Sequence, residues 1–185
     1  MKRTQIINFA DLLHWWPYLC EDTRSEIQAL TPPEMFRGEP APQDLNGIPL
    51  EQLARLQDAT ADELHYAVGE VLYGVDRQTV EQFPAREFMG IYNMVTHELK
   101  RISDLFASLG REFTPDEIRA GAQDINHGSF GLADWYAQRM GMHNHDDAFA
   151  TPWARIFTCR KNDQEMQEYR EKLQEIQIQN MKNRR

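Results

Sequence analysis

The stretch PAREFMGIYNMVTHELKRISDLFASLG, residues 84–110, contains the longest periodic pattern of apolar side chains in the sequence. These side chains recur at steps of three and four and so form one stripe on a helix: Phe88, Tyr92, Val95, Leu99, Ile102, Phe106 and Leu109. The opposite face is polar and carries Glu87, Asn93, Glu98, Arg101 and Ser108. A proline begins the stretch and a glycine ends it. The pattern predicts a long central helix over residues 84–109.

Signals for helix starts recur on both sides of this stretch. Thr60 and Thr114 are each followed three residues later by a glutamate, the spacing of a capping box, and Thr151 precedes a proline. Ser129 is the expected cap of a helix that contains Trp135. With the apolar periodicity that follows them, these signals predict helices over residues 61–73, 115–126, 130–140 and 152–178. Sustained alternation typical of strands is absent, so the predicted fold class is all-α: a multi-helix bundle with a long central helix and a long C-terminal helix.

The N-terminal third is less regular. Phe9 to Trp16 has the character of an apolar helix that Pro17 disturbs, and residues 37–47, with two prolines and two glycines, are expected to form turns and loop. We therefore expect an N-terminal helical segment with its loop over residues 1–45, a main helical domain over 46–180 and a basic tail over 181–185.

The C-terminal segment combines a charged surface with a narrow apolar stripe, which we call the C-terminal seam: Met166, Tyr169, Leu173 and Ile176. Asn162 and Asp163 are candidate caps for a second helix inside this segment, and fraying is expected beyond Ile178. A narrow stripe on a long charged helix suits either packing on the body of the protein or pairing with another chain. The sequence leaves both alternatives open. If the stripe pairs with another chain, that chain can be a second copy, so a homo-oligomer is possible.

Composition excludes several classes of function. The 185 residues carry a formal net charge of −9, and the basic cluster at the C-terminal tip follows a helix rich in glutamate, so nucleic acid is not an expected partner. No stretch is apolar enough to span a membrane, and no secretory signal is recognised at the start, so a cytoplasmic location in the host cell, or a place in a virion, is expected. Cys20 and Cys159 do not form a CxxC motif and are expected to be reduced thiols, although spacing alone does not exclude a bridge.

Recognisable enzyme motifs are absent: the sequence has no Walker A loop, no GxGxxG, no HExxH and no nucleophile elbow. We therefore expect no catalytic residues and no cofactor. The alternative hypothesis is a metal-binding protein or metalloenzyme that uses imidazoles and carboxylates clustered around one loop: His127, His143, His145, Asp146 and Asp147. In the competing interpretation Asn144 or Asp146 caps a short helix and the histidines are solvated. The pairs Asp62/His65 and Asp124/His127 have the i, i+3 spacing of di-iron bundles, although those bundles use glutamate in place of aspartate.

Adjacent tryptophans, Trp15 and Trp16, point about 100° apart on a helix, so both rings do not easily face one narrow core. One of them is therefore a candidate for an interface, where tryptophan is enriched. The expected partner-binding residues are Trp15 and Trp16 together with Met166, Tyr169 and Leu173 of the C-terminal seam.

A series of short sequence elements runs from residue 117 to residue 173: EIRAG, GSFGLADWYA, RMG, the His/Asp cluster, TPW and YREKL. This series resembles small helical morphogenesis proteins of tailed bacteriophages and prophages, particularly tail-assembly chaperones. The resemblance implies a non-enzymatic protein that binds other phage structural or assembly proteins, such as the tape-measure protein that the chaperones coat, or a stable virion component. An acidic regulator that blocks a DNA-binding partner is a further hypothesis, which the negative charge favours.

Overall fold

The computed structural model describes residues 7–110, 114–122 and 127–183, and this part of the chain is mostly helical, as predicted. The chain divides into two compact units, one up to Ser103 and one from Asp104 onward, so the division falls inside the central helix α6 (Ala85–Ala107). None of the described helices combines the length and apolar character that crossing a membrane requires.

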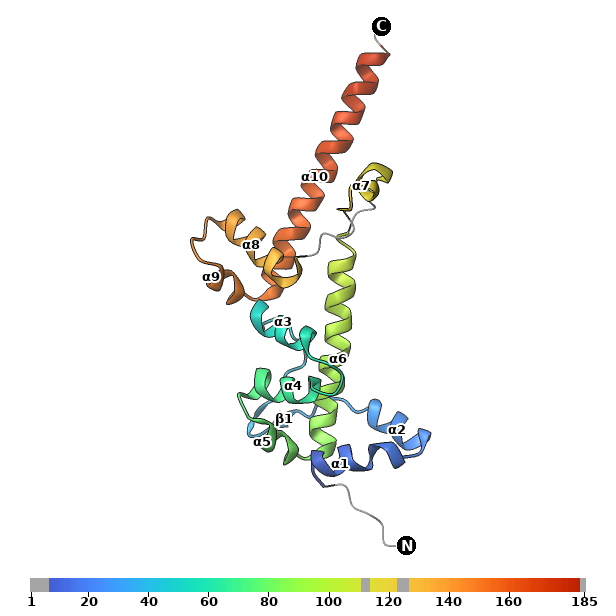
Figure 1. The fold of residues 1–185 in the computed structure, drawn as a ribbon, viewed down its shortest axis with the longest axis vertical. Coiled ribbons are helices and arrows are strands. Elements are labelled where there is room, and N and C mark those ends of the chain that lie inside the picture. The colour runs from blue at the N-terminus through green and yellow to red at the C-terminus, as the bar shows by residue number, and fades with distance from the viewer. Residues whose placement is uncertain (1–6, 111–113, 123–126, 184–185) are drawn as a thin grey trace. The chain divides into compact units, whose positions relative to one another are not determined.

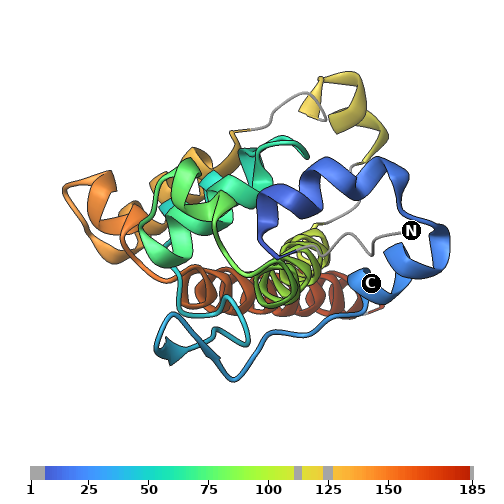
Figure 2. The same cartoon turned by 90° about the horizontal axis from the view of Figure 1, so that it is seen from below.

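The first unit surrounds the N-terminal part of α6 with short elements, as the two perpendicular views in Figures 1 and 2 show. In chain order these elements are α1 (Phe9–Trp15), the 3-10 turn η1 (Trp16–Tyr18), α2 (Glu21–Gln28), β1 (Met35–Phe36), β2 (Glu39–Pro40), α3 (Leu50–Asp58), α4 (Leu64–Tyr73) and α5 (Arg77–Glu81). The predicted disturbance at Pro17 is confirmed, because α1 ends where the 3-10 turn begins. The helices α2, α3 and α5 were not predicted from the sequence.

The core of the first unit is built on the predicted apolar stripe of α6. Phe88, Val95 and Ile102 are completely buried. The Phe88 ring packs edge-on against Phe9 of α1, with 4.8 Å between ring centroids, and lies 5.0 Å from the Phe83 ring. The N-terminal segment therefore packs directly on α6, a point that the sequence left open.

A short β-hairpin, which the sequence did not predict, overlaps the beginning of the stretch 37–47 that was expected to form turns and loop. Met35 pairs with Pro40 and Phe36 with Glu39, and the two-residue turn between the strands has positive φ at Arg37 (55°) and Gly38 (85°). Strands of two residues contain too few positions to show an alternating pattern, so the sequence carried no strand signal here. The hairpin buries Phe36 against Phe83, with 5.1 Å between ring centroids.

Two predictions for the first unit are wrong. Asn93 is not on a solvent face of α6 but is 8% exposed, and its amide donates to the carbonyls of Ile27 and Leu30 (2.9 and 3.1 Å). The Thr60/Glu63 capping box does not form, because α4 begins only at Leu64, after a turn in which the Thr60 carbonyl accepts from the backbone. Asn93 is buried because a segment distant in sequence packs on it. The capping box is absent because a tight turn precedes α4.

The second unit contains the end of α6, α7 (Pro115–Arg119), α8 (Gly128–Met140), α9 (His145–Phe149) and α10 (Trp153–Lys182). The predicted Thr114/Glu117 capping box is present, but α7 ends at Arg119, and residues 123–126 of the predicted helix lie outside the described residues. Asn144 caps α9 by accepting from the Asp146 amide, as the competing interpretation of the His/Asp loop expected. Ser129 does not cap α8, because it lies inside the first helical turn.

The core of this unit forms where α8, α9 and the start of α10 meet. Tyr136, Ala148, Trp153 and Ile156 are buried, and the Phe106 ring lies 6.1 Å from that of Trp153. The long C-terminal helix is confirmed.

Three local expectations for α10 are wrong. Asp163 starts no second helix, because α10 is continuous and the Asp163 carboxylate accepts from Arg139 of α8 (2.8 Å). The helix also continues beyond Ile178 to Lys182. Thr151 does not cap it, because Pro152 occupies the N-cap position and no side chain caps this helix; the Thr151 hydroxyl donates to the Asp147 carbonyl (2.9 Å). Arg184 and Arg185 of the predicted basic tail lie outside the described residues.

Candidate partner-binding surfaces

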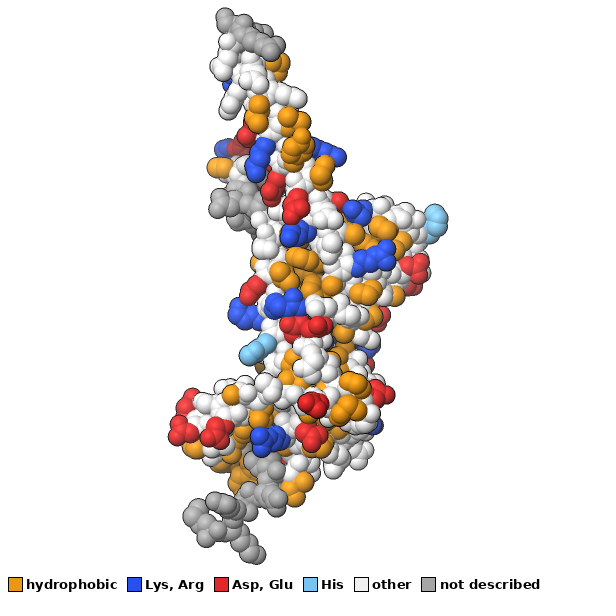
Figure 3. Space-filling model, turned by 180° about the vertical axis from the view of Figure 1, so that it is seen from behind, with side chains coloured by type: hydrophobic (Ala, Val, Ile, Leu, Met, Phe, Trp, Pro, Cys, Tyr) orange, Lys and Arg blue, Asp and Glu red, His pale blue; other side chains and the backbone are white. Residues whose placement is uncertain are grey.

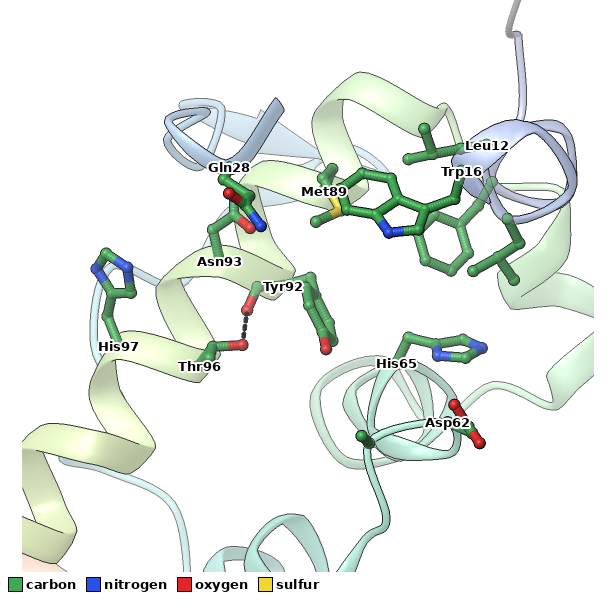
Figure 4. Close-up of a pocket in the computed structure, with 13 residues that line it drawn as sticks. Leu12, Trp16, Gln28, Asp62, His65, Met89, Tyr92, Asn93, Thr96 and His97 are labelled. Atoms are coloured by element: carbon green, nitrogen blue, oxygen red, sulfur yellow. Dashed lines mark hydrogen bonds between the residues drawn. The ribbon is translucent and has the colours of Figure 1, made fainter. Parts of the chain in front are cut away.

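The first unit contains an open pocket of about 610 Å³, which we call the N-terminal pocket. Its lining comes from four segments: α1 with η1, the end of α2, the turn before α4 with the first turn of that helix, and the middle of α6. Figure 4 shows the Trp16 ring beside Met89 on one side of the pocket, with Tyr92 and His65 on the other side. Aromatic and methionine side chains on a concave surface are typical of sites that receive an apolar group.

The two adjacent tryptophans have different surroundings, as the helical angle between them requires. Trp16 is half-buried in the N-terminal pocket, and Arg24 lies 6.0 Å from its ring centroid. Trp15 is 37% exposed and packs edge-on with Tyr18, which is 75% exposed. An exposed aromatic pair therefore lies immediately beside the pocket residue in sequence.

Two buried polar groups, His65 and Asn93, contribute to the pocket lining. The Nε2 atom of His65 has no hydrogen-bond partner, and the ring packs 5.3 Å from that of Phe9. Burial, and then the charge of Arg77, hold the pKa of His65 below its usual value. The imidazole is therefore neutral near neutral pH, and the pocket carries no positive charge from this residue.

The C-terminal seam lies on a fully exposed part of α10. Met166, Tyr169, Leu173 and Ile176 are 50%, 60%, 41% and 54% exposed. Every residue from 165 to 183 is exposed, and Figure 3 shows hydrophobic side chains along this part of the helix among charged ones. Within its own unit, the seam is not covered by other described residues.

The seam and the core-facing side chains of α10 occupy opposite faces of the helix. Trp153 and Tyr169 are separated by sixteen positions, which at about 100° per residue amounts to roughly 160° around the axis. Ile156 and Ile176 are twenty positions apart, and the same calculation also separates them by roughly 160° around the axis. The seam therefore faces away from the side of α10 that the core of its own unit covers.

The proposed metal ligands are not brought together. His145 pairs with Asp134 of α8 (Nε2 to Oδ1, 2.9 Å), and the His145 ring, followed by the Gln138 amide, holds the pKa of Asp134 below its usual range. His143 and Asp147 are exposed. Within residues 7–110, 114–122 and 127–183, no group of three or more metal-ligating side chains is close enough to hold an ion.

Of the two Asp/His pairs with the di-iron spacing, only Asp62/His65 is fully described, and it does not form a metal site. Asp62 is exposed and His65 is buried against Phe9, and although both line the N-terminal pocket, they belong to no group of three or more metal-ligating side chains among the described residues. Asp124 of the second pair lies outside the described residues.

Sequence reasoning named Trp16 but missed the other walls of the N-terminal pocket. Met89, Tyr92 and His97 come from α6 and meet the α1 side chains only in the folded chain. Tyr92 had been assigned to the core stripe and is in fact half-buried at the pocket surface. The helical period identifies which residues share a face, but it does not show which of them are covered by neighbouring elements.

Compared with models of protein families, with curated proteins and with solved structures, the chain matches none of them significantly.

Proposed function

We propose that this protein acts without catalysis, by binding other proteins during the assembly of a bacteriophage tail or virion. The observation that carries the binding role is the N-terminal pocket, an open cavity of about 610 Å³ whose lining includes Trp16, the neighbour in sequence of the exposed Trp15. Support for the phage context comes from the resemblance of residues 117–173 to tail-assembly chaperones.

The pocket has the properties of a receptor for one apolar side chain of a partner helix. Leu12, Met89 and Tyr92 provide an apolar part of the lining. His65 has its pKa lowered and adds no positive charge near neutral pH, and the charged Asp62 of the lining is exposed to solvent. Helix-in-groove recognition uses apolar residues spaced by three and four, and a flanking tryptophan adds contact area. The net charge of −9 would keep a protein that exposes apolar surface in solution.

The test is co-purification of the tagged full chain with the products of its neighbouring genes, including a tape-measure protein. Leu13→Glu places a carboxylate at the pocket, whose lining includes Leu13, and is expected to reduce recovery of the partner at least about tenfold. Gln57→Glu adds the same charge on an exposed position of α3 that does not line the pocket, and should retain the partner. Recovery of no virion or tape-measure protein with the unaltered chain would contradict the proposal.

A further inference from the structure

We propose that the C-terminal seam binds the same seam of a second copy of this chain, forming a short parallel coiled coil over residues 162–183. This inference goes beyond the function proposed above, which depends on a different surface in the other unit. Either proposal can fail while the other stands.

The geometry of the seam is that of a coiled-coil interface. Met166, Tyr169, Leu173 and Ile176 are separated by three, four and three residues, so Met166 and Leu173 take heptad position a and the other two take position d. All four are at least 41% exposed, and the seam faces away from the core side of α10. A partner helix can therefore approach this face.

Charge complementarity identifies that partner as a second copy in parallel orientation. In the heptad frame Glu165 is at position g and Arg170 at the following position e, the pair that meets between two parallel helices. Two symmetric Glu165–Arg170 ion pairs would flank the apolar layers. An antiparallel arrangement that keeps all four layers instead places the two Arg170 side chains opposite each other. Both residues are exposed in the single chain, so they are accessible to a partner.

Asn180 supports a defined alignment of the two helices. It occupies the a position that follows Leu173 and is exposed within α10. An asparagine at one a position favours the register in which it meets its own counterpart, because any other register buries its amide against an apolar side chain. In the parallel arrangement this register also aligns each seam residue with itself.

The first experiment measures the molar mass of the full chain by sedimentation velocity, up to its highest soluble concentration. The unaltered chain is expected to self-associate with rising concentration. Leu173→Glu should be monomeric throughout, because it places like charges against each other inside the interface. Gln174→Glu adds the same charge one position away, off the seam, and should associate like the unaltered chain. A monomeric unaltered chain would overturn the proposal, and so would self-association that survives Leu173→Glu.

The second experiment exchanges the charges of the proposed ion pair. Glu165→Lys and Arg170→Glu are each expected to weaken association roughly tenfold, since each turns two attractions into two repulsions. The double variant restores opposite charges and should recover most of the affinity. Circular dichroism of each variant at low concentration checks that α10 remains helical. If the double variant loses as much association free energy as the two single variants together, the two residues do not pair between chains.

The orientation has its own test, in a background with Cys20→Ser and Cys159→Ser. Asn183→Cys introduces a thiol at the d position after Asn180. In the parallel arrangement the two new thiols are adjacent and should form an intermolecular disulfide under mild oxidation. In an antiparallel arrangement they lie at opposite ends of the interface, so the absence of the cross-link in an associating protein would overturn the parallel assignment.

Discussion

His65 and Asn93 are the buried polar side chains of the described core, and they satisfy their polar atoms differently. Asn93 donates twice, to the carbonyls of Ile27 and Leu30, and so joins the end of α2 to α6. His65 leaves Nε2 without a partner beside the Phe9 ring. A buried amide with two acceptors stabilises the fold, whereas a buried imidazole in an apolar setting makes it sensitive to protonation.

Folding stability is expected to decrease as the pH falls from about 7 to about 5, with His65 as one cause. Burial lowers the pKa of His65 below the 6.5 of the unfolded chain, so the unfolded state takes up the proton first. The stabilising contribution is therefore fully present above that unfolded pKa and is lost as the pH falls through the folded pKa.

Urea unfolding at a series of pH values measures this effect. His65→Gln should show a flatter decrease than the unaltered chain over this interval. His143→Gln, a change at an exposed histidine, should retain the original slope. Equal slopes for the unaltered chain and His65→Gln would contradict the assignment.

At the level of secondary structure, α6 depends on close approach by a segment far away in the sequence. Gly90 lies against the backbone of Thr31 and Pro32, and a Cβ at this position would collide with the Thr31 carbonyl oxygen. The obstacle is backbone, so a rotamer change does not relieve it. The Thr31–Pro32 segment, which leads from α2 to the hairpin, therefore requires glycine at this turn of α6.

Gly90→Ala is expected to lower the free energy of unfolding by about 1–3 kcal/mol, although alanine is the better helix former by about 1 kcal/mol. The overlap with backbone outweighs the gain in helix propensity. Gly47→Ala is the matched control, since a Cβ there meets nothing within 4 Å, and its effect should stay within about 1 kcal/mol. Urea unfolding measures both variants, and an unchanged or higher stability of Gly90→Ala would show that the Thr31 segment yields easily.

For the whole molecule, the exposed end of α10 is expected to contribute to association and not to the stability of either unit. Residues 165–183 are all exposed and bury no side chain in the single chain. A chain that ends at Glu168 should therefore keep the free energy of unfolding of the full chain within about 0.5 kcal/mol when both are dilute. The shortened chain should also lose self-association. A decrease of several kcal/mol would instead indicate that the end of α10 packs on the rest of the protein.

The elements that could be predicted from the sequence are those with local signals. The 84–110 stretch becomes α6 because seven apolar residues repeat with the helical period, and Thr114 caps α7 because its hydroxyl and Glu117 are three residues apart. Gly141 ends α8 because the left-handed conformation found there, φ 66°, suits glycine. The apolar spacing of the C-terminal seam could also be predicted, since it is local, whereas its exposure could not, because the sequence left packing on the body open.

Contacts between distant segments decided the rest. Asn93 looks like a surface residue until Ile27 and Leu30 supply its acceptors, sixty or more positions away in the chain. The N-terminal pocket exists only because Trp16 and Tyr92 come from helices that meet on folding. Helix formation responds to neighbours within one or two turns, whereas burial depends on which surfaces meet, and that is set by the packing of the whole chain.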